Sequence, residues 1–146
     1  MERLGIAEVE ELAFELARRH MEFDEPIPDF SSRFPGILES CLAVPFQQCF
    51  GQAPYPTLAA KAAILFYLMV KNHPFQNGNK RIAVTALFVL LFKNGKWLQV
   101  EMADLYHFTV RLAESKPQDK NLMVAAMTGL VSTNMVDFVP ADTDPK

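Results

Sequence analysis

The residues best suited to chemistry form one run in the middle of the chain, His73-Pro74-Phe75-Gln76-Asn77-Gly78-Asn79-Lys80-Arg81. An imidazole can take a proton from a hydroxyl group, and N–H groups and cations at the start of a helix can hold an anion. Glycine at position 78 lets the backbone turn and lets a ligand approach closely. The run therefore has the residue types needed to bind a phosphate chain and to activate a hydroxyl beside it.

A helix is predicted to begin at about Asn79, and this start defines the candidate site. Its first N–H groups would carry the positive end of the helix dipole without intrahelical partners. Lys80 and Arg81 are unfavourable there unless an anion also binds. We therefore predict a phosphate cradle at Gly78–Arg81, with His73 across the loop as the proton acceptor. The alternative is a structural histidine beside a solvated turn, and the combination of features favours the site.

Two long apolar segments must position this run. Thr57 is expected to cap a helix from Leu58 to about Asn72, and a second helix is expected from about Asn79 to Lys93. Both are apolar nearly all round, which predicts burial, and their length favours helix over strand. Asn94-Gly95 supplies a left-handed stop to the second helix.

Further helices are expected at about 7–20, from Phe34-Pro35 to Pro45, at about 103–114 and at about 119–131. In the first of these helices the predicted inward residues are Val9, Leu12, Ala13, Leu16 and Ala17. In the second they are Ile37, Leu38, Cys41 and Leu42. Segments 21–33, 45–56 and 97–99 are expected to be loops, and the second could contain a small extended hairpin. The predicted fold is all-α, one compact domain over residues 1–146 around a buried helix–loop–helix pair, with about 1–5 and 140–146 loose.

The composition excludes several classes of protein. Half of the 146 residues are hydrophobic and the mean hydropathy is +0.07, values typical of a globular chain and not of a disordered one. Apolar stretches are too short to span a membrane, and the acidic N-terminus does not resemble a secretory signal, so we expect a cytoplasmic protein without membrane association. Cys41 and Cys49 are too few for a disulfide scaffold and are expected to be reduced, partly buried thiols.

The net charge of −3 conceals an asymmetry. Between Glu39 and Glu101 the chain has no acidic residue, yet this stretch contains Lys61, Lys71, Lys80, Arg81, Lys93 and Lys96. The pattern predicts a positive field that favours an anionic partner, although a buried core would also lack carboxylates. Direct nucleic-acid binding is not expected, because the cations are few and scattered among apolar residues.

The run from His73 to Arg81 resembles the signature loop of the Fic/Doc family and is closer to its death-on-curing (Doc) branch. The resemblance implies a compact helical domain and an enzyme that moves part of a nucleotide onto a protein hydroxyl. In the Fic branch the transferred group is AMP. In the Doc branch it is the terminal phosphate of ATP, transferred to a threonine of a translation factor, and a separate antitoxin neutralises the toxin.

Position by position, the resemblance makes His73 the general base. It places Gly78, Asn79 and Lys80 in the anion hole, lets Lys80 and Arg81 hold phosphates, and gives Pro74 and Phe75 a supporting role. Lys80 stands where AMP-transferring members usually have glycine, and Val84 stands where they have a second arginine. Both departures favour phosphate transfer from ATP to a protein Ser or Thr, with AMP transfer as the alternative.

Three further expectations come from the resemblance. Asn77 occupies the position of the family's acidic metal ligand, so Mg²⁺ is expected to bind weakly there, and the alternative is a catalytically impaired module that binds a nucleotide or a partner. Val44-Pro45-Phe46-Gln47 corresponds to a flap that docks the target backbone, or else is an ordinary connector. The family's self-inhibitory pattern, Ser/Thr-x-x-x-Glu-Gly/Asn, has no match in this sequence, which implies a separate antitoxin. His20 and His107 are interpreted as structural.

Overall fold

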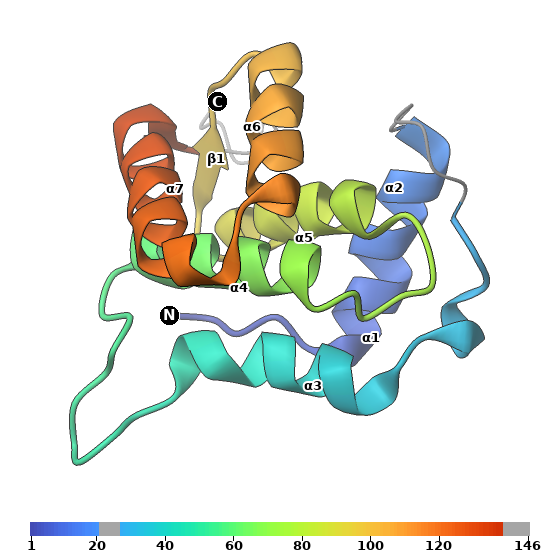
Figure 1. Ribbon diagram of the computed structural model, residues 1–146, viewed down its shortest axis with the longest axis horizontal. Coiled ribbons are helices and arrows are strands. Elements are labelled where there is room, and N and C mark those ends of the chain that lie inside the picture. The colour runs from blue at the N-terminus through green and yellow to red at the C-terminus, as the bar shows by residue number, and fades with distance from the viewer. Residues whose placement is uncertain (21–26, 139–146) are drawn as a thin grey trace, which may run out of the picture.

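The computed structural model describes residues 1–20 and 27–138. At its centre α4 (Leu58–Lys71) and α5 (Asn79–Lys93) pack side by side and are joined by the loop at 72–78 (Figure 1). The Thr57 hydroxyl caps α4 by accepting a hydrogen bond from the Ala60 N–H at 3.1 Å. Most side chains of both helices are buried, which explains why their sequences are apolar on nearly every face.

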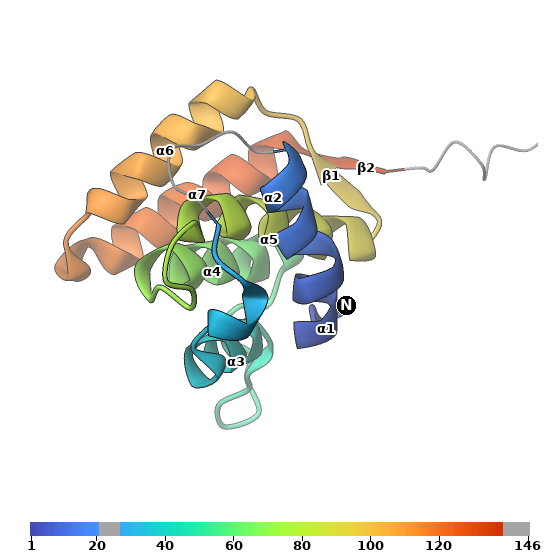
Figure 2. The same ribbon diagram turned by 90° about the vertical axis from the view of Figure 1, so that its right-hand side faces the viewer.

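Other helices cover this pair on two sides. α3 (Pro35–Ala43) lies on one side of it, and α6 (Met102–Glu114) and α7 (Lys120–Asn134) lie on the other (Figures 1 and 2). Short 3-10 turns at Phe30–Ser32, Val44–Phe46 and Pro117–Asp119 connect the elements. The mostly helical architecture confirms the predicted fold class. In the part of the chain that the structure describes, no helix has the length and apolar character needed to cross a lipid bilayer.

The N-terminal helix contains a widened turn that the sequence prediction missed. It runs as α1 (Ile6–Glu8), a π-helical segment (Val9–Phe14) and α2 (Glu15–His20). A π turn holds more residues than an α turn, so the buried face shifts along the sequence. Phe14 is buried, whereas Leu12 and Leu16, predicted to face inward, are exposed.

α3 also differs from its predicted inward face. Leu38, Cys41 and Leu42 are buried as expected, but Ile37 is 38% exposed. The two cysteines are not alike: Cys41 is buried and Cys49 is exposed. Burial raises the pKa of the Cys41 thiol to about 11, although a backbone hydrogen bond acts against this.

The thiols should therefore react at very different rates. With iodoacetamide at about pH 8, we expect Cys49 to be alkylated at least about 100-fold faster than Cys41, because the thiolate is the reactive form and burial blocks access. Mass spectrometry of peptides from the native protein measures both rates. Equal labelling of the two peptides would contradict the burial of Cys41.

A small antiparallel sheet replaces the loop predicted at 97–99. β1 (Lys96–Leu98) pairs with β2 (Met135–Asp137), with Trp97 opposite Val136. The strands are too short for a periodic pattern and are far apart in the sequence, so neither strand could be predicted from its own residues.

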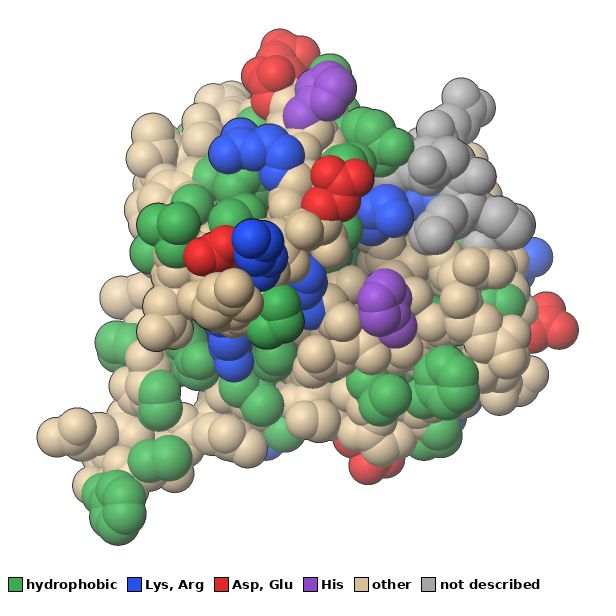
Figure 3. All heavy atoms as spheres, viewed as in Figure 1, with side chains coloured by type: hydrophobic (Ala, Val, Ile, Leu, Met, Phe, Trp, Pro, Cys, Tyr) green, Lys and Arg blue, Asp and Glu red, His purple; other side chains and the backbone are tan. Residues whose placement is uncertain are grey.

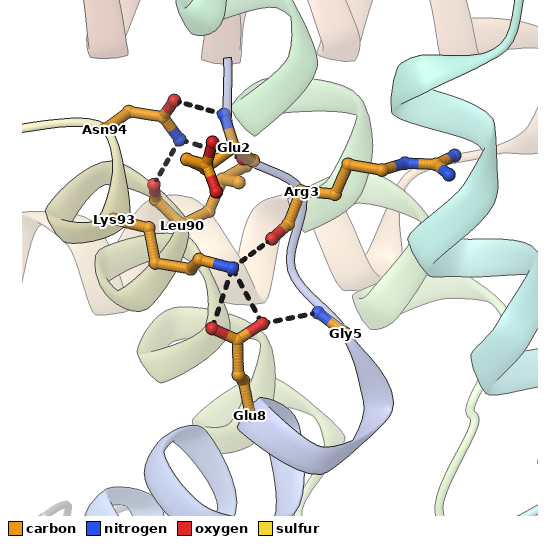
Figure 4. Close-up of polar contacts among 7 residues, drawn as sticks. All are labelled: Glu2, Arg3, Gly5, Glu8, Leu90, Lys93 and Asn94. Atoms are coloured by element: carbon orange, nitrogen blue, oxygen red, sulfur yellow. Dashed lines mark hydrogen bonds and ion pairs between the residues drawn. The ribbon is translucent and has the colours of Figure 1, made fainter.

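The first residues of the chain are held in place, contrary to the expectation that 1–5 are loose (Figure 4). Both Glu8 carboxylate oxygens lie 2.7 Å from Lys93 Nζ, and one also accepts the Gly5 N–H at 2.9 Å. The Asn94 side chain accepts the Glu2 N–H at 2.7 Å and donates to the Glu2 carbonyl at 3.0 Å. The expected loose segment 140–146 lies outside the described residues.

Glu8→Gln should destabilise the protein by about 1 kcal/mol at about pH 7. Burial alone would raise the pKa of Glu8, but hydrogen bonds from Lys93 and Gly5 and the Lys93 charge outweigh it and lower the pKa. A lowered pKa means that this stability is present above the ordinary value and is lost as the pH falls through the lowered one. Urea unfolding at about pH 7 and pH 3 should show the wild-type advantage only at the higher pH.

Candidate active site

The loop begins with a strained histidine. α4 is capped at Asn72, and the next residue, His73, has φ 52°. Glycine is the usual residue at this left-handed position after a helix, and another residue there costs about 1 kcal/mol or more. The His73 side chain is exposed to solvent. Strained backbone conformations of this kind cluster at functional sites, which makes His73 a candidate.

The other end of the loop presents the start of α5. Gly78 is the N-cap, with φ 74°, a conformation that favours glycine. Its carbonyl accepts the Ile82 N–H at 3.0 Å, which is the first helical bond. Asn79, Lys80 and Arg81 therefore form the first turn, as predicted, and their N–H groups lie at the positive end of the helix dipole.

The Asn79 side chain closes the loop between these two ends. It is buried, and its Oδ1 accepts the Phe75 N–H at 2.9 Å while its Nδ2 donates to the Phe75 carbonyl at 2.8 Å. The same Nδ2 lies 3.4 Å from His73 Nδ1. This side chain thus fixes the loop and touches the candidate base, a role that sequence reasoning missed when it assigned Asn79 only to the anion hole.

Phe75 and Pro74 anchor the loop to the rest of the domain, as the sequence suggested. The Phe75 ring is fully buried and lies 5.7 Å from the rings of Phe14 and Phe30. The Pro74 carbonyl accepts the Phe34 N–H at 2.8 Å, which ties the loop to the start of α3. The loop is therefore held by a core aromatic on one side and by α3 on the other.

Arg81 is also held by the fold. Its Nη2 donates to the Ala17 carbonyl of α2, and one turn later Thr85 donates to the Ala13 carbonyl at 2.7 Å. α5 is thereby fixed against the N-terminal helix. The Arg81 guanidinium lies close to the cradle as a positive charge, but its direction is set partly by α2.

Four lysines of the carboxylate-free stretch are bonded elsewhere in the fold. Lys61 and Lys71 donate to backbone carbonyls of the connector and of the end of α6. Lys93 and Lys96 form ion pairs with carboxylates. The carboxylates of these two ion pairs offset the charges of Lys93 and Lys96, whereas Lys61 and Lys71 stay positive because a carbonyl carries no net charge.

The predicted flap, Val44–Gln47, is not brought together with His73. Val44–Phe46 forms a 3-10 helix, and Lys61 at the start of α4 donates to the Pro45 carbonyl at 3.2 Å. His73 follows the other end of α4, about 20 Å away along a helix of 14 residues (Figure 1). The hairpin expected nearby is a single bridge between Cys49 and Gln52.

The expected magnesium site lacks a set of protein ligands. Within residues 1–20 and 27–138, no group of three or more His, Cys, Asp or Glu side chains could hold a metal ion. Asn77 is exposed and offers one amide oxygen. Because Mg²⁺ prefers carboxylate and phosphate oxygens, these residues do not by themselves fit the ion.

Taken together, the geometry defines a helical domain in which the start of α5 lies across a short loop from an exposed, strained imidazole. Residues 5–91 match the Fic/DOC family. This match covers more than half of the chain, which therefore belongs to the Fic/DOC family and has the Fic fold. Members of this family are typically transferases that modify proteins.

One curated relative is the Toxin Doc of Mycolicibacterium smegmatis. It is 36% identical over 66 residues, which are 45% of this chain and 51% of the relative. The chain thus matches about half the length of that relative. No solved structure matches the chain significantly.

Proposed function

We propose that this protein transfers the terminal phosphate of ATP to a Ser or Thr hydroxyl of another protein. The observation that carries the proposal is the pairing of an exposed, strained His73 with the first turn of α5 across one short, anchored loop. The membership of the family supports it, and so does the similarity to a protein named Toxin Doc.

His73 acts as the general base in this proposal. The acceptor hydroxyl loses its proton to the imidazole, and its oxygen forms a bond to the γ-phosphorus. The bond between the γ-phosphorus and the bridging oxygen breaks, and ADP leaves. Positioning and charge neutralisation supply most of the catalysis, because a phosphoryl transfer needs little covalent chemistry from the protein.

The start of α5 holds the phosphates. The N–H groups of the first turn and the Lys80 ammonium stabilise the negative charge, and Arg81 adds its positive charge from the side of α2. The Asn79 side chain holds the loop in place through its two hydrogen bonds to the Phe75 backbone. No step is assigned to Mg²⁺, since the side chains of residues 1–20 and 27–138 do not form a site for it.

A separate inhibitory protein is part of the proposal. A transferase that modifies a translation factor would harm its own cell, and the relative is named a toxin. We therefore propose an antitoxin partner. Expression of the chain in bacteria should slow growth, and His73→Ala should relieve the toxicity.

The test uses α-labelled and γ-labelled ATP in parallel. Purified protein is incubated with Mg²⁺ and a bacterial lysate, and labelled proteins are resolved on a gel. Label from the γ position alone is the expected result. Label from the α position would show AMP transfer instead. An absence of label in both tubes, with ATP bound, would indicate a binding module that does not catalyse transfer.

A further inference from the structure

A hollow of about 360 Å³ opens in the surface beside the proposed site. It is lined by Gly36, Ile37 and Ser40 of α3 and by Asn72, the residue before His73. Gly36 and Ser40 are four positions apart and so lie on one face of α3. The hollow is thus continuous with the start of the loop, whereas the phosphate cradle lies at the loop's other end.

The hollow is open and mixed in character, with Ile37 as its apolar side chain and Ser40 and Asn72 as its polar ones. All four lining residues are exposed, and the large side chains of Phe34 and Ile37 are 44% and 38% exposed. Hydrophobic side chains gather over the start of α3, next to the loop between α4 and α5 (Figure 3). Exposed aromatic and aliphatic side chains that border a catalytic loop are typical of a surface that meets a partner.

The chemistry of the lining fits the acceptor better than the donor. None of the four lining residues carries a charge, so the hollow offers a phosphate chain no cation, only the Ser40 hydroxyl and the Asn72 amide as hydrogen-bond donors. A small-molecule site usually buries roughly 70–90% of the surface of its ligand. Four exposed residues cannot enclose a nucleobase to that extent. An open, uncharged hollow can receive one side chain of a protein segment that lies across it.

We infer that this hollow receives an uncharged side chain of the protein acceptor, next to the hydroxyl that is modified. The inference rests on the proposed function. It also supplies a docking surface near His73, which Val44–Gln47 does not, because that segment lies at the opposite end of α4. The acceptor side chain sits against Ile37 and Gly36, and the neighbouring hydroxyl reaches His73 past Asn72.

Gly36→Leu fills the hollow without disturbing the fold. A Cβ at Gly36 would meet no atom within 4 Å, and the position is helical, so a larger residue is accommodated. Gly129→Leu is a matched control: Gly129 is exposed in α7, and a Cβ there also meets no atom within 4 Å. Neither change should lower the thermal midpoint, since leucine favours a helix more than glycine does.

The expected result is selective loss of the acceptor. With γ-labelled ATP and a dilution series of bacterial lysate, Gly36→Leu should lower the initial labelling rate about tenfold at limiting lysate, with partial recovery at high lysate. ATP binding, measured by calorimetry, should equal that of the wild type. Gly129→Leu should match the wild type in both assays. Unchanged labelling by Gly36→Leu would overturn the inference, and so would weakened ATP binding, which would assign the hollow to the donor.

A second pair of variants separates polarity from shape. Ile37→Asp should lower the labelling rate in the same way, whereas Ile37→Leu should keep it near that of the wild type. Loss of labelling in both variants would contradict docking through apolar contact. If the proposed function is wrong, the wild-type protein itself will give no label from either position of ATP. That result differs from the loss expected for Gly36→Leu alone, and it would also overturn the inference.

Discussion

Asn79→Ala should lower the transfer rate by about 100-fold or more, since small misplacements of a catalytic group have effects of that size. The substitution removes the two hydrogen bonds to Phe75 and the contact with His73 Nδ1. It also leaves the buried Phe75 N–H and carbonyl without this partner, which should destabilise the protein by about 2 kcal/mol. Initial rates with γ-labelled ATP, at a temperature where both proteins are folded, measure the effect.

Asn94→Ala provides a matched control. The Asn94 side chain makes three hydrogen bonds, to the backbone of Glu2 and to the Leu90 carbonyl, but it lies at the other end of α5. This variant should lose about 1 kcal/mol, because its bonds are exposed or half-buried, and should keep its transfer rate. Equal loss of transfer in the two variants would show that the rate follows general stability and not the shape of the loop.

Phe75→Ala should destabilise the protein by about 3–5 kcal/mol, a large share of the stability of a domain of this size. The ring is fully buried between Phe14 and Phe30, so its removal leaves a cavity and unties the loop from the N-terminal helix. Urea unfolding monitored by circular dichroism measures the change.

Phe50→Ala removes a ring of the same size from the surface. Phe50 is fully exposed at the turn between Cys49 and Gln52, so its loss should change stability by less than about 0.5 kcal/mol. If both variants unfolded at the same urea concentration, Phe75 would not be the anchor described above.

Much of the fold could be predicted because its signals are local. The cap at Thr57, the continuous apolar character of α4 and the start of α5 at Asn79 each depend on residues a few positions apart. The same holds for the motif loop, where Gly78 and the first turn of α5 lie together in the sequence and in space.

The remaining features depend on contacts between distant parts of the chain. The π-helical turn moves Leu12 and Leu16 to the surface, and on the same helix the Ala13 carbonyl accepts a hydrogen bond from Thr85 of α5. β1 and β2 are strands because their backbones pair with each other, although they are far apart in the sequence. The sequence showed an excess of central lysines but could not show that most of them bond to carbonyls or carboxylates of other elements.

His73 illustrates the same limit within the site. Its residue type and place in the motif indicated a general base, but the left-handed backbone became visible only in the structure. Glycine would fit this position better, so retaining histidine there works against stability. That cost supports a functional role for His73, which the proposed transfer reaction requires.

The most direct measurement compares His73→Gly with the wild type in label transfer from γ-labelled ATP. Transfer should fall at least about 100-fold while the thermal midpoint does not decrease, because glycine adopts the left-handed conformation without a Cβ penalty. His107→Ala, which changes an exposed histidine on α6, should retain full transfer. Transfer by His73→Gly at the wild-type rate would show that His73 is not the base.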